Sequence, residues 1–139
     1  MRTVFADAGY WIALLNPRDR LHERAKRVSR LVGRHRVVTS ELVLIEYLDD
    51  SSCRGEFMRR LAVGTVERLR QDGNTTIVPL SKAQFAAALK MYAERPDKTW
   101  SLTDCSSFQI MERYGLREAF AHDEHFEQAG FKALLREET

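Results

Sequence analysis

Residues 3–16 read TVFADAGYWIALLN, and this stretch decides the fold class. Its first part, residues 3–7, is short and rich in β-branched and aromatic residues, which is typical of a strand. Gly9 follows almost at once and permits a tight exit into the apolar run YWIALLN. The chain then turns at residues 16–19, NPRD, so the segment predicts a strand that leads directly into a second apolar element.

Helices and strands alternate along the rest of the chain. Apolar residues at helical spacing, bounded by Ser caps, Gly or Pro, predict helices at residues 20–33, 41–50, 57–69, 81–95 and 104–115. Short apolar runs predict strands at residues 37–39, 75–80, 119–123 and 131–135, with a short helix or turn over 124–130. The alternation predicts an α/β fold: a three-layer α/β/α sandwich with a mainly parallel central sheet, as a single domain over residues 1–139.

The composition is that of an ordered soluble protein. The 139 residues are 44% hydrophobic and 30% charged, with seven Gly and three Pro, which argues against disordered, fibrous and membrane classes. The formal charge of +2 does not by itself indicate a nucleic-acid-binding protein. Arginines and lysines nevertheless concentrate in residues 18–36 and in the pairs Arg59, Arg60 and Arg68, Arg70. They form either solvated helix faces or a surface for RNA phosphates.

The N-terminus predicts a cytoplasmic protein. Asp7 interrupts the first apolar run and no small-residue cleavage site follows, so no signal peptide is indicated. Cys53 and Cys105 lack a CxxC partner. Reduced thiols are the expectation for that compartment.

Four carboxylates are predicted to meet at one edge of the sheet. Asp7 ends the first strand, Glu46 lies early in the helix after the second, Asp104 opens a helix, and Asp123 ends the fourth strand. Ligands of parallel α/β sheets gather at the carboxyl ends of the strands. Two carboxylates about 5 Å apart repel by roughly 3 kcal/mol at an effective dielectric constant near 20. A bound Mg²⁺ or Mn²⁺ would relieve that repulsion, since both prefer oxygen ligands, and would suit the attack of water on a phosphodiester.

Each acid also has a purely structural interpretation. Asp7 fits a turn or cap, Asp123 an Asx-turn, Glu46 a buried partner of an arginine, and Asp104 the last residue of an S-x-x-D capping box. Two histidines, His122 and His125, bracket Asp123, but without a third ligand this spacing is a weak indication of zinc.

Four segments carry a resemblance to a known family: FADAGYWIALLN (5–16), TSELVLIEYL (39–48), WSLTDCSSFQIM (100–111) and FAHDEHFEQAGF (120–131). In this order and spacing, over nearly the whole chain, they resemble the PIN-domain ribonucleases, and among them the VapC-type toxins of bacterial toxin-antitoxin operons. The family often has a Ser or Thr after the first Asp and before the last; Ala8, Gly9 and His122 stand there instead, while Thr103 keeps a hydroxyl beside Asp104.

The resemblance implies a function and a site. It implies a Mg²⁺- or Mn²⁺-dependent endoribonuclease whose catalytic and metal-binding residues are Asp7, Glu46, Asp104 and Asp123. It also implies an RNA substrate, a cognate antitoxin protein whose tail fills the active site, and a homodimer. Trp100 is expected to pack rather than to stack on a base, and residues 10–15 to pack in the core rather than to offer a groove to a partner helix.

Two other functions stay open. One is a catalytically idle PIN-like module that binds RNA or a protein partner, which the presence of all four acids argues against. The other is a phosphate-handling α/β domain with Asp7 as phosphoacceptor. This second possibility fits poorly, because Gly9 stands where one such class needs a second Asp and the other class needs paired acids before the strand-end Asp.

Overall fold

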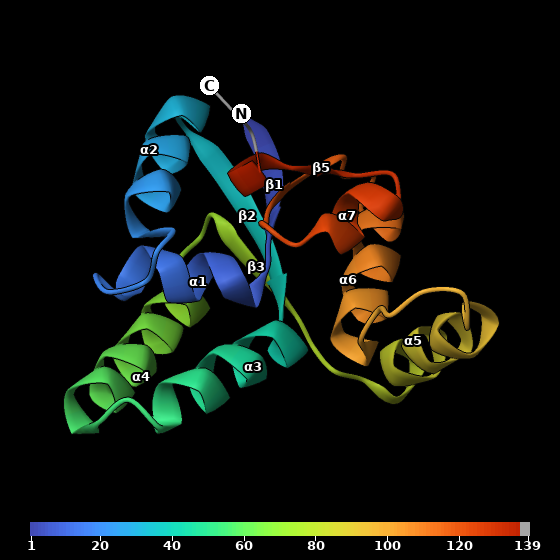
Figure 1. Cartoon of the computed structure of the whole chain (residues 1–139), viewed down its shortest axis with the longest axis horizontal. Coiled ribbons are helices and arrows are strands. Elements are labelled where there is room, and N and C mark those ends of the chain that lie inside the picture. The colour runs from blue at the N-terminus through green and yellow to red at the C-terminus, as the bar shows by residue number, and fades with distance from the viewer. Residues whose placement is uncertain (137–139) are drawn as a thin grey trace.

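Five short strands form one sheet in the computed structural model, which describes residues 1–136 (Figure 1). The strands are β1 (Arg2–Ala6), β2 (His35–Ser40), β3 (Thr75–Val78), β4 (Glu118–Phe120) and β5 (Lys132–Ala133). They pair in the order β3-β2-β1-β4-β5, and every pairing is parallel. The predicted α/β fold is confirmed, and the sheet is wholly parallel.

Seven α-helices of the described residues cover the two faces of the sheet. They are α1 (Ala8–Leu15), α2 (His22–Val32), α3 (Glu41–Ser52), α4 (Glu56–Gln71), α5 (Lys82–Glu94), α6 (Leu102–Arg113) and α7 (Glu124–Gln128); a 3₁₀ turn, η1 (Leu134–Arg136), follows β5. Figure 1 shows α1 to α4 on one side of the strands and α5 to α7 on the other. This is the predicted three-layer arrangement. Within residues 1–136, none of the helices has the length and apolar character needed to cross a membrane.

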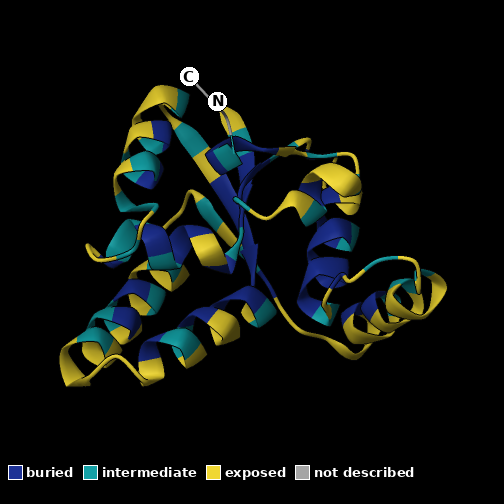
Figure 2. Ribbon diagram, viewed as in Figure 1, coloured by how far each residue is buried: buried dark blue, intermediate teal, exposed yellow. Residues whose placement is uncertain are grey.

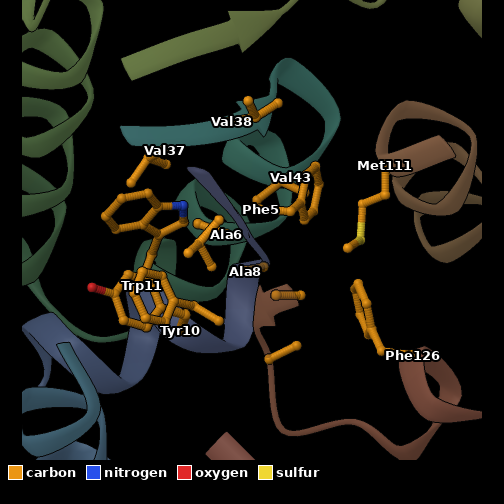
Figure 3. Close-up of a cluster of buried hydrophobic side chains, with 14 of the residues drawn as sticks. Phe5, Ala6, Ala8, Tyr10, Trp11, Val37, Val38, Val43, Met111 and Phe126 are labelled. Carbon is orange, nitrogen blue, oxygen red and sulfur yellow. The ribbon is translucent and has the colours of Figure 1, made fainter. Parts of the chain in front are cut away.

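The core lies on both faces of β1. Val4, Phe5 and Ala6 are fully buried in succession, as expected for a central parallel strand with helices on each side (Figure 2). Tyr10 and Trp11 of α1 turn toward the sheet (Figure 3), and the Tyr10 ring stacks on Phe120 at a centroid distance of 4.3 Å. The prediction that α1 packs in the core is therefore confirmed.

Trp100 also packs. It is 6% exposed, meets Phe108 edge-on, and donates its indole N–H to Gln128 Oε1 over 3.0 Å. Cys53 and Cys105 are both free, as the sequence predicted.

The last two strands are shorter than predicted. The fourth strand ends at Phe120 rather than Asp123, because Asp123 instead caps α7 by accepting the His125 backbone N–H. A side chain that bonds its own backbone in this way competes with the strand ladder. The fifth strand has two residues, since the chain enters η1 at Leu134.

Several large apolar side chains of α4 and α5 are exposed, although apolar residues recur at helical spacing in both segments. Phe57 on α4 is 75% exposed, and Phe85, Leu89 and Tyr92 on α5 are about half exposed. The buried faces carry smaller or polar side chains instead: Ala62 and Thr65 on α4, Gln84 and Ala88 on α5. Gln84 fits there because its amide donates to the Ser106 side chain of α6 over 3.2 Å.

Candidate metal centre

The site begins at the point where the strand order reverses. The strands β2 and β3 extend the sheet on one side of β1, and the later strands β4 and β5 extend it on the other side. Asp7 directly follows β1, and its backbone N–H donates to the Phe120 carbonyl at the end of β4 over 3.1 Å. Ligand crevices of open parallel sheets lie at such a switch point, outside the carboxyl ends of the strands. Asp7 therefore lies at the base of the region where such a sheet binds its ligand.

Glu46 reaches the site from α3. That helix starts directly after β2, where Ser40 caps it by accepting the Val43 backbone N–H over 3.1 Å. Glu46 is exposed on the second turn of α3, and the nearby Thr103 side chain at the start of α6 lowers its pKa. The hydroxyl that the sequence places beside Asp104 thus serves the other carboxylate.

Asp104 is both a cap and a member of the cluster. Ser101 Oγ accepts the Asp104 backbone N–H over 3.0 Å, while Asp104 Oδ2 accepts the Ser101 backbone N–H over 3.1 Å. This reciprocal capping box begins α6, as its sequence predicts. The residue is only 8% exposed, so the box fixes its carboxylate firmly at the helix N-terminus, where backbone dipoles favour an anion.

Asp123 likewise combines a structural role with a place at the site. It lies three residues beyond β4, and its Oδ1 accepts the His125 backbone N–H over 3.0 Å. Its side chain remains 43% exposed. The Asx-turn interpretation of Asp123 is therefore correct as well, and it uses one carboxylate oxygen.

The four carboxylates lie close enough to repel one another. The pKa of Asp7 is raised to about 7, mainly by burial and also by the charges of Asp104, Glu46 and Asp123, against the lowering effect of a backbone hydrogen bond. Burial and neighbouring carboxylates also raise the pKa of Glu46, which the Thr103 side chain opposes. The structure therefore gathers all four predicted site residues into one electrostatic cluster.

No arginine or lysine neutralises this cluster within residues 1–136. The arginine and lysine ion pairs formed between residues 1–136 involve other carboxylates. The alternative in which Glu46 pairs with an arginine is thus wrong for the described residues. Because no arginine or lysine of residues 1–136 pairs with these four carboxylates, a bound divalent cation would stabilise the cluster.

The His125 side chain lies directly against two of the acids. Its Nδ1 lies 3.0 Å from Asp104 Oδ2 and 3.2 Å from Asp123 Oδ1. These three residues present ligand atoms within 4.8 Å of one another and could hold a metal ion. From the sequence, His125 is indicated only as one of two histidines at a weak zinc spacing. Its position two residues after Asp123, which caps α7, is the sequence feature that points to its contact with the acids.

His122, the other half of that pair, belongs to a different environment. Its pKa is lowered by partial burial and then by the charges of Arg20, Arg136 and Arg24. Arg136 also donates to the His122 backbone carbonyl over 3.2 Å. The two histidines therefore do not act as a metal pair. The three arginines form a basic group near His122, the residue before Asp123.

The donor set fits a hard divalent cation better than zinc. Four carboxylates and a single imidazole offer mainly oxygen atoms, which Mg²⁺ and Mn²⁺ accept readily, whereas zinc sites favour His and Cys. The cluster is consistent with a divalent metal site.

Comparison with known proteins agrees with this geometry. The PIN domain family matches residues 4–132, which includes all four acids. The chain belongs to the PIN-domain family. No curated protein matches it significantly in sequence.

Solved structures show the same PIN-domain architecture. The VapC20 toxin of Mycobacterium tuberculosis, described as a toxin that cleaves the sarcin-ricin loop, is 27% identical with a TM-score of 0.81, and the match covers 92% of this chain and 95% of VapC20. FitAcB from Neisseria gonorrhoeae is 20% identical with a TM-score of 0.60, covering 94% of each chain, and shows the fold alone. This PIN domain therefore resembles VapC-type toxins in structure.

Proposed function

We propose that this PIN domain is a metal-dependent endoribonuclease, the toxin of a toxin-antitoxin pair, which hydrolyses phosphodiester bonds in RNA. The observation that carries the proposal is the cluster of four carboxylates at the switch point of the sheet, none of which has an arginine or lysine ion-pair partner among residues 1–136. The structural similarity to VapC20, a toxin that cleaves RNA in the sarcin-ricin loop, supports RNA as the substrate class.

The roles of the acids follow from their positions. Three of the acids would hold the ion: Asp7, Glu46 and Asp104. The more exposed Asp123 would complete the cluster or orient the attacking water. A bound Mg²⁺ or Mn²⁺ supplies charge stabilisation and a lowered pKa for an attacking water. Asp7 would lose its proton to take part in binding, since the cation favours the ionised form.

Basic side chains beside Asp123 would bind the RNA backbone. Arg20, Arg24 and Arg136 all act on His122, the neighbour of Asp123. Two of them also support the fold, because Arg24 donates to the Leu135 carbonyl and Arg136 to the His122 carbonyl. Arg20 is exposed at the start of the basic segment and is the best candidate for a phosphate contact.

Replacing Arg20 is expected to weaken RNA binding in a salt-dependent way. In Arg20→Gln, the slope of log affinity against log salt concentration should fall by about 0.7, the value for one phosphate contact with a single strand. Fluorescence anisotropy in a chelator-containing buffer measures this without cleavage. Arg70→Gln on α4, which removes the partner of Glu67, is the control with the same charge change. Equal slopes for both variants and the wild type would show that Arg20 does not contact phosphate.

The nature of the nucleophile offers a direct test of the proposal. If water attacks the phosphorus, cleavage should not need the ribose 2′-hydroxyl and should leave no 2′,3′-cyclic phosphate. An RNA substrate found in a structured pool would be resynthesised with a single 2′-O-methyl group at the mapped bond and incubated with protein and Mg²⁺. Continued cleavage supports hydrolysis; a block together with cyclic ends in the unmodified substrate would contradict it. Absence of all cleavage would favour an idle binding module.

We further propose a cognate antitoxin and a homodimer as the partners. Structural similarity to VapC20, a toxin, supports the antitoxin, and the resemblance of the sequence to VapC-type toxins implies the homodimer. Large apolar side chains that the fold leaves exposed offer surface for such contacts: Phe57 and Val63 on α4, and Phe85, Leu89 and Tyr92 on α5.

A further inference from the structure

We propose that His125 is a positioning residue that sets the two carboxylates of Asp104 and Asp123 for divalent-ion binding. This inference rests on the proposed function, because it assigns a fifth residue to the same site. His125 is the second residue of α7, and its side chain is 18% exposed. The ring therefore sits between the N-terminus of α6 and that of α7, where it touches one acid from each.

The imidazole makes three polar contacts. Nδ1 lies 3.0 Å from Asp104 Oδ2 and 3.2 Å from Asp123 Oδ1, and Nε2 lies 3.3 Å from Thr99 Oγ1. The Thr99 hydroxyl can donate to Nε2, which puts the ring proton on Nδ1 in the neutral tautomer. Nδ1–H is then the donor that faces both carboxylates, and the tautomer is assigned from this hydrogen-bond network.

The hydrogen bonds use one oxygen of each carboxylate and leave the other. Asp104 Oδ2 accepts from Ser101 N–H and from the imidazole, and Asp123 Oδ1 accepts the His125 backbone N–H and lies 3.2 Å from the imidazole Nδ1. Within residues 1–136, Asp104 Oδ1 and Asp123 Oδ2 have no hydrogen-bond or ion-pair partner. The two free oxygens are thus the ones available to a cation, and the caps and His125 fix their direction.

This arrangement distinguishes a positioning role from direct ligation. To coordinate an ion through Nδ1, the ring would have to give up its hydrogen bond to Asp104 and its contact with Asp123, and reverse its tautomer. As a donor to them it needs no change on ion binding. Partners that hold a ligating side chain by hydrogen bonds typically contribute 10–100-fold to metal affinity.

The test is the affinity of the full chain for Mn²⁺, measured by calorimetry without RNA. His125→Ala should bind Mn²⁺ about 10–100-fold more weakly than the wild type. His125→Asn places an amide N–H near the position of Nδ1 and should bind nearly as tightly as the wild type. His35→Ala, which removes a histidine at the opposite end of the sheet, should bind as the wild type does. Thermal unfolding of each variant checks that it is folded.

Pulsed electron paramagnetic resonance of bound Mn²⁺ gives an independent readout. No directly coordinated nitrogen is expected in the wild type, and strong ¹⁴N coupling that disappears in His125→Ala would overturn the positioning role in favour of ligation. Unchanged or tighter Mn²⁺ binding by His125→Ala would also overturn the inference. In RNA cleavage, His125→Ala should need more Mn²⁺ to reach half its maximal rate, with less change in that maximum.

Failure of this inference and failure of the proposed function have different signatures. If the wild type cleaves RNA and His125→Ala binds Mn²⁺ as tightly as the wild type, only the positioning role is refuted. A wild type that binds Mn²⁺ through a His125-dependent site and never cleaves RNA refutes only the nuclease.

Discussion

Asp104→Asn is expected to lower the rate of RNA cleavage by about 100-fold or more while the protein stays folded. An amide replaces an ionised ligand at the most buried acid of the cluster. Loss of metal-dependent charge stabilisation is worth several kcal/mol, and each 1.36 kcal/mol corresponds to a factor of ten. The fold should survive because the amide oxygen can still accept the Ser101 backbone N–H that completes the capping box.

Initial cleavage rates at saturating Mg²⁺ measure the effect of this substitution. Asp49→Asn is the matched control, since Asp49 is an exposed acid on α3, one turn beyond Glu46. It removes the same charge at an exposed position and should leave the rate close to that of the wild type. A rate for Asp104→Asn within a few-fold of the control would remove Asp104 from the catalytic site.

Asp7→Asn is expected to stabilise the metal-free protein at pH 8 by up to about 4 kcal/mol. The folded protein raises the pKa of Asp7 to about 7 from an ordinary value of 3.8. Well below pH 3.8 the carboxyl is protonated in both states, so it has no effect on stability. As the pH rises, the unfolded chain ionises first, and the folded state loses stability until its own Asp7 ionises near pH 7. The gap between these pKa values corresponds to about 4 kcal/mol.

Urea unfolding of the wild type and Asp7→Asn, in buffer with chelator at pH 4.5 and pH 8, measures this difference. The variant should exceed the wild type in free energy of unfolding by much more at pH 8 than at pH 4.5. Comparison of the two proteins at each pH cancels the contributions of other groups, such as Asp72 and Asp97, whose pKa values are lowered by hydrogen bonds. A difference in the free energy of unfolding that does not vary with pH, or a variant that is less stable at pH 8, would show that burial and repulsion do not raise the pKa of Asp7.

The strand-helix alternation and the caps could be predicted from the sequence because they depend on local chemistry. Ser101 and Asp104 form a capping box within four residues, and β1 contains an apolar run at residues 4–6, so neither needs tertiary information. The gathering of four acids followed from one topological rule, that parallel strands present their carboxyl ends at the same edge. That rule also explains why the structural interpretations of Asp104 and Asp123 did not exclude a place at the site: each cap uses a single oxygen.

Other features depend on contacts between distant segments. The exposed position of Phe57 and Phe85 could not be predicted, because helical periodicity identifies an apolar stripe but not which side of a helix meets the next layer. The approach of His125 to Asp104 joins residues 21 positions apart and depends on the angle between α6 and α7. The early end of β4 likewise reflects competition between strand pairing and the α7 cap, which differ little in local preference.

The measurement that tests the central claim most directly is cleavage of a structured RNA pool by the purified, antitoxin-free wild-type protein, with Mg²⁺, with Mn²⁺ and with excess chelator. The account predicts cleavage with either ion, none with chelator, and recovery when Mn²⁺ is added back. Cleavage that persists in chelator, or folded protein that cuts under none of these conditions, would contradict the assignment of the four carboxylates to a catalytic metal centre.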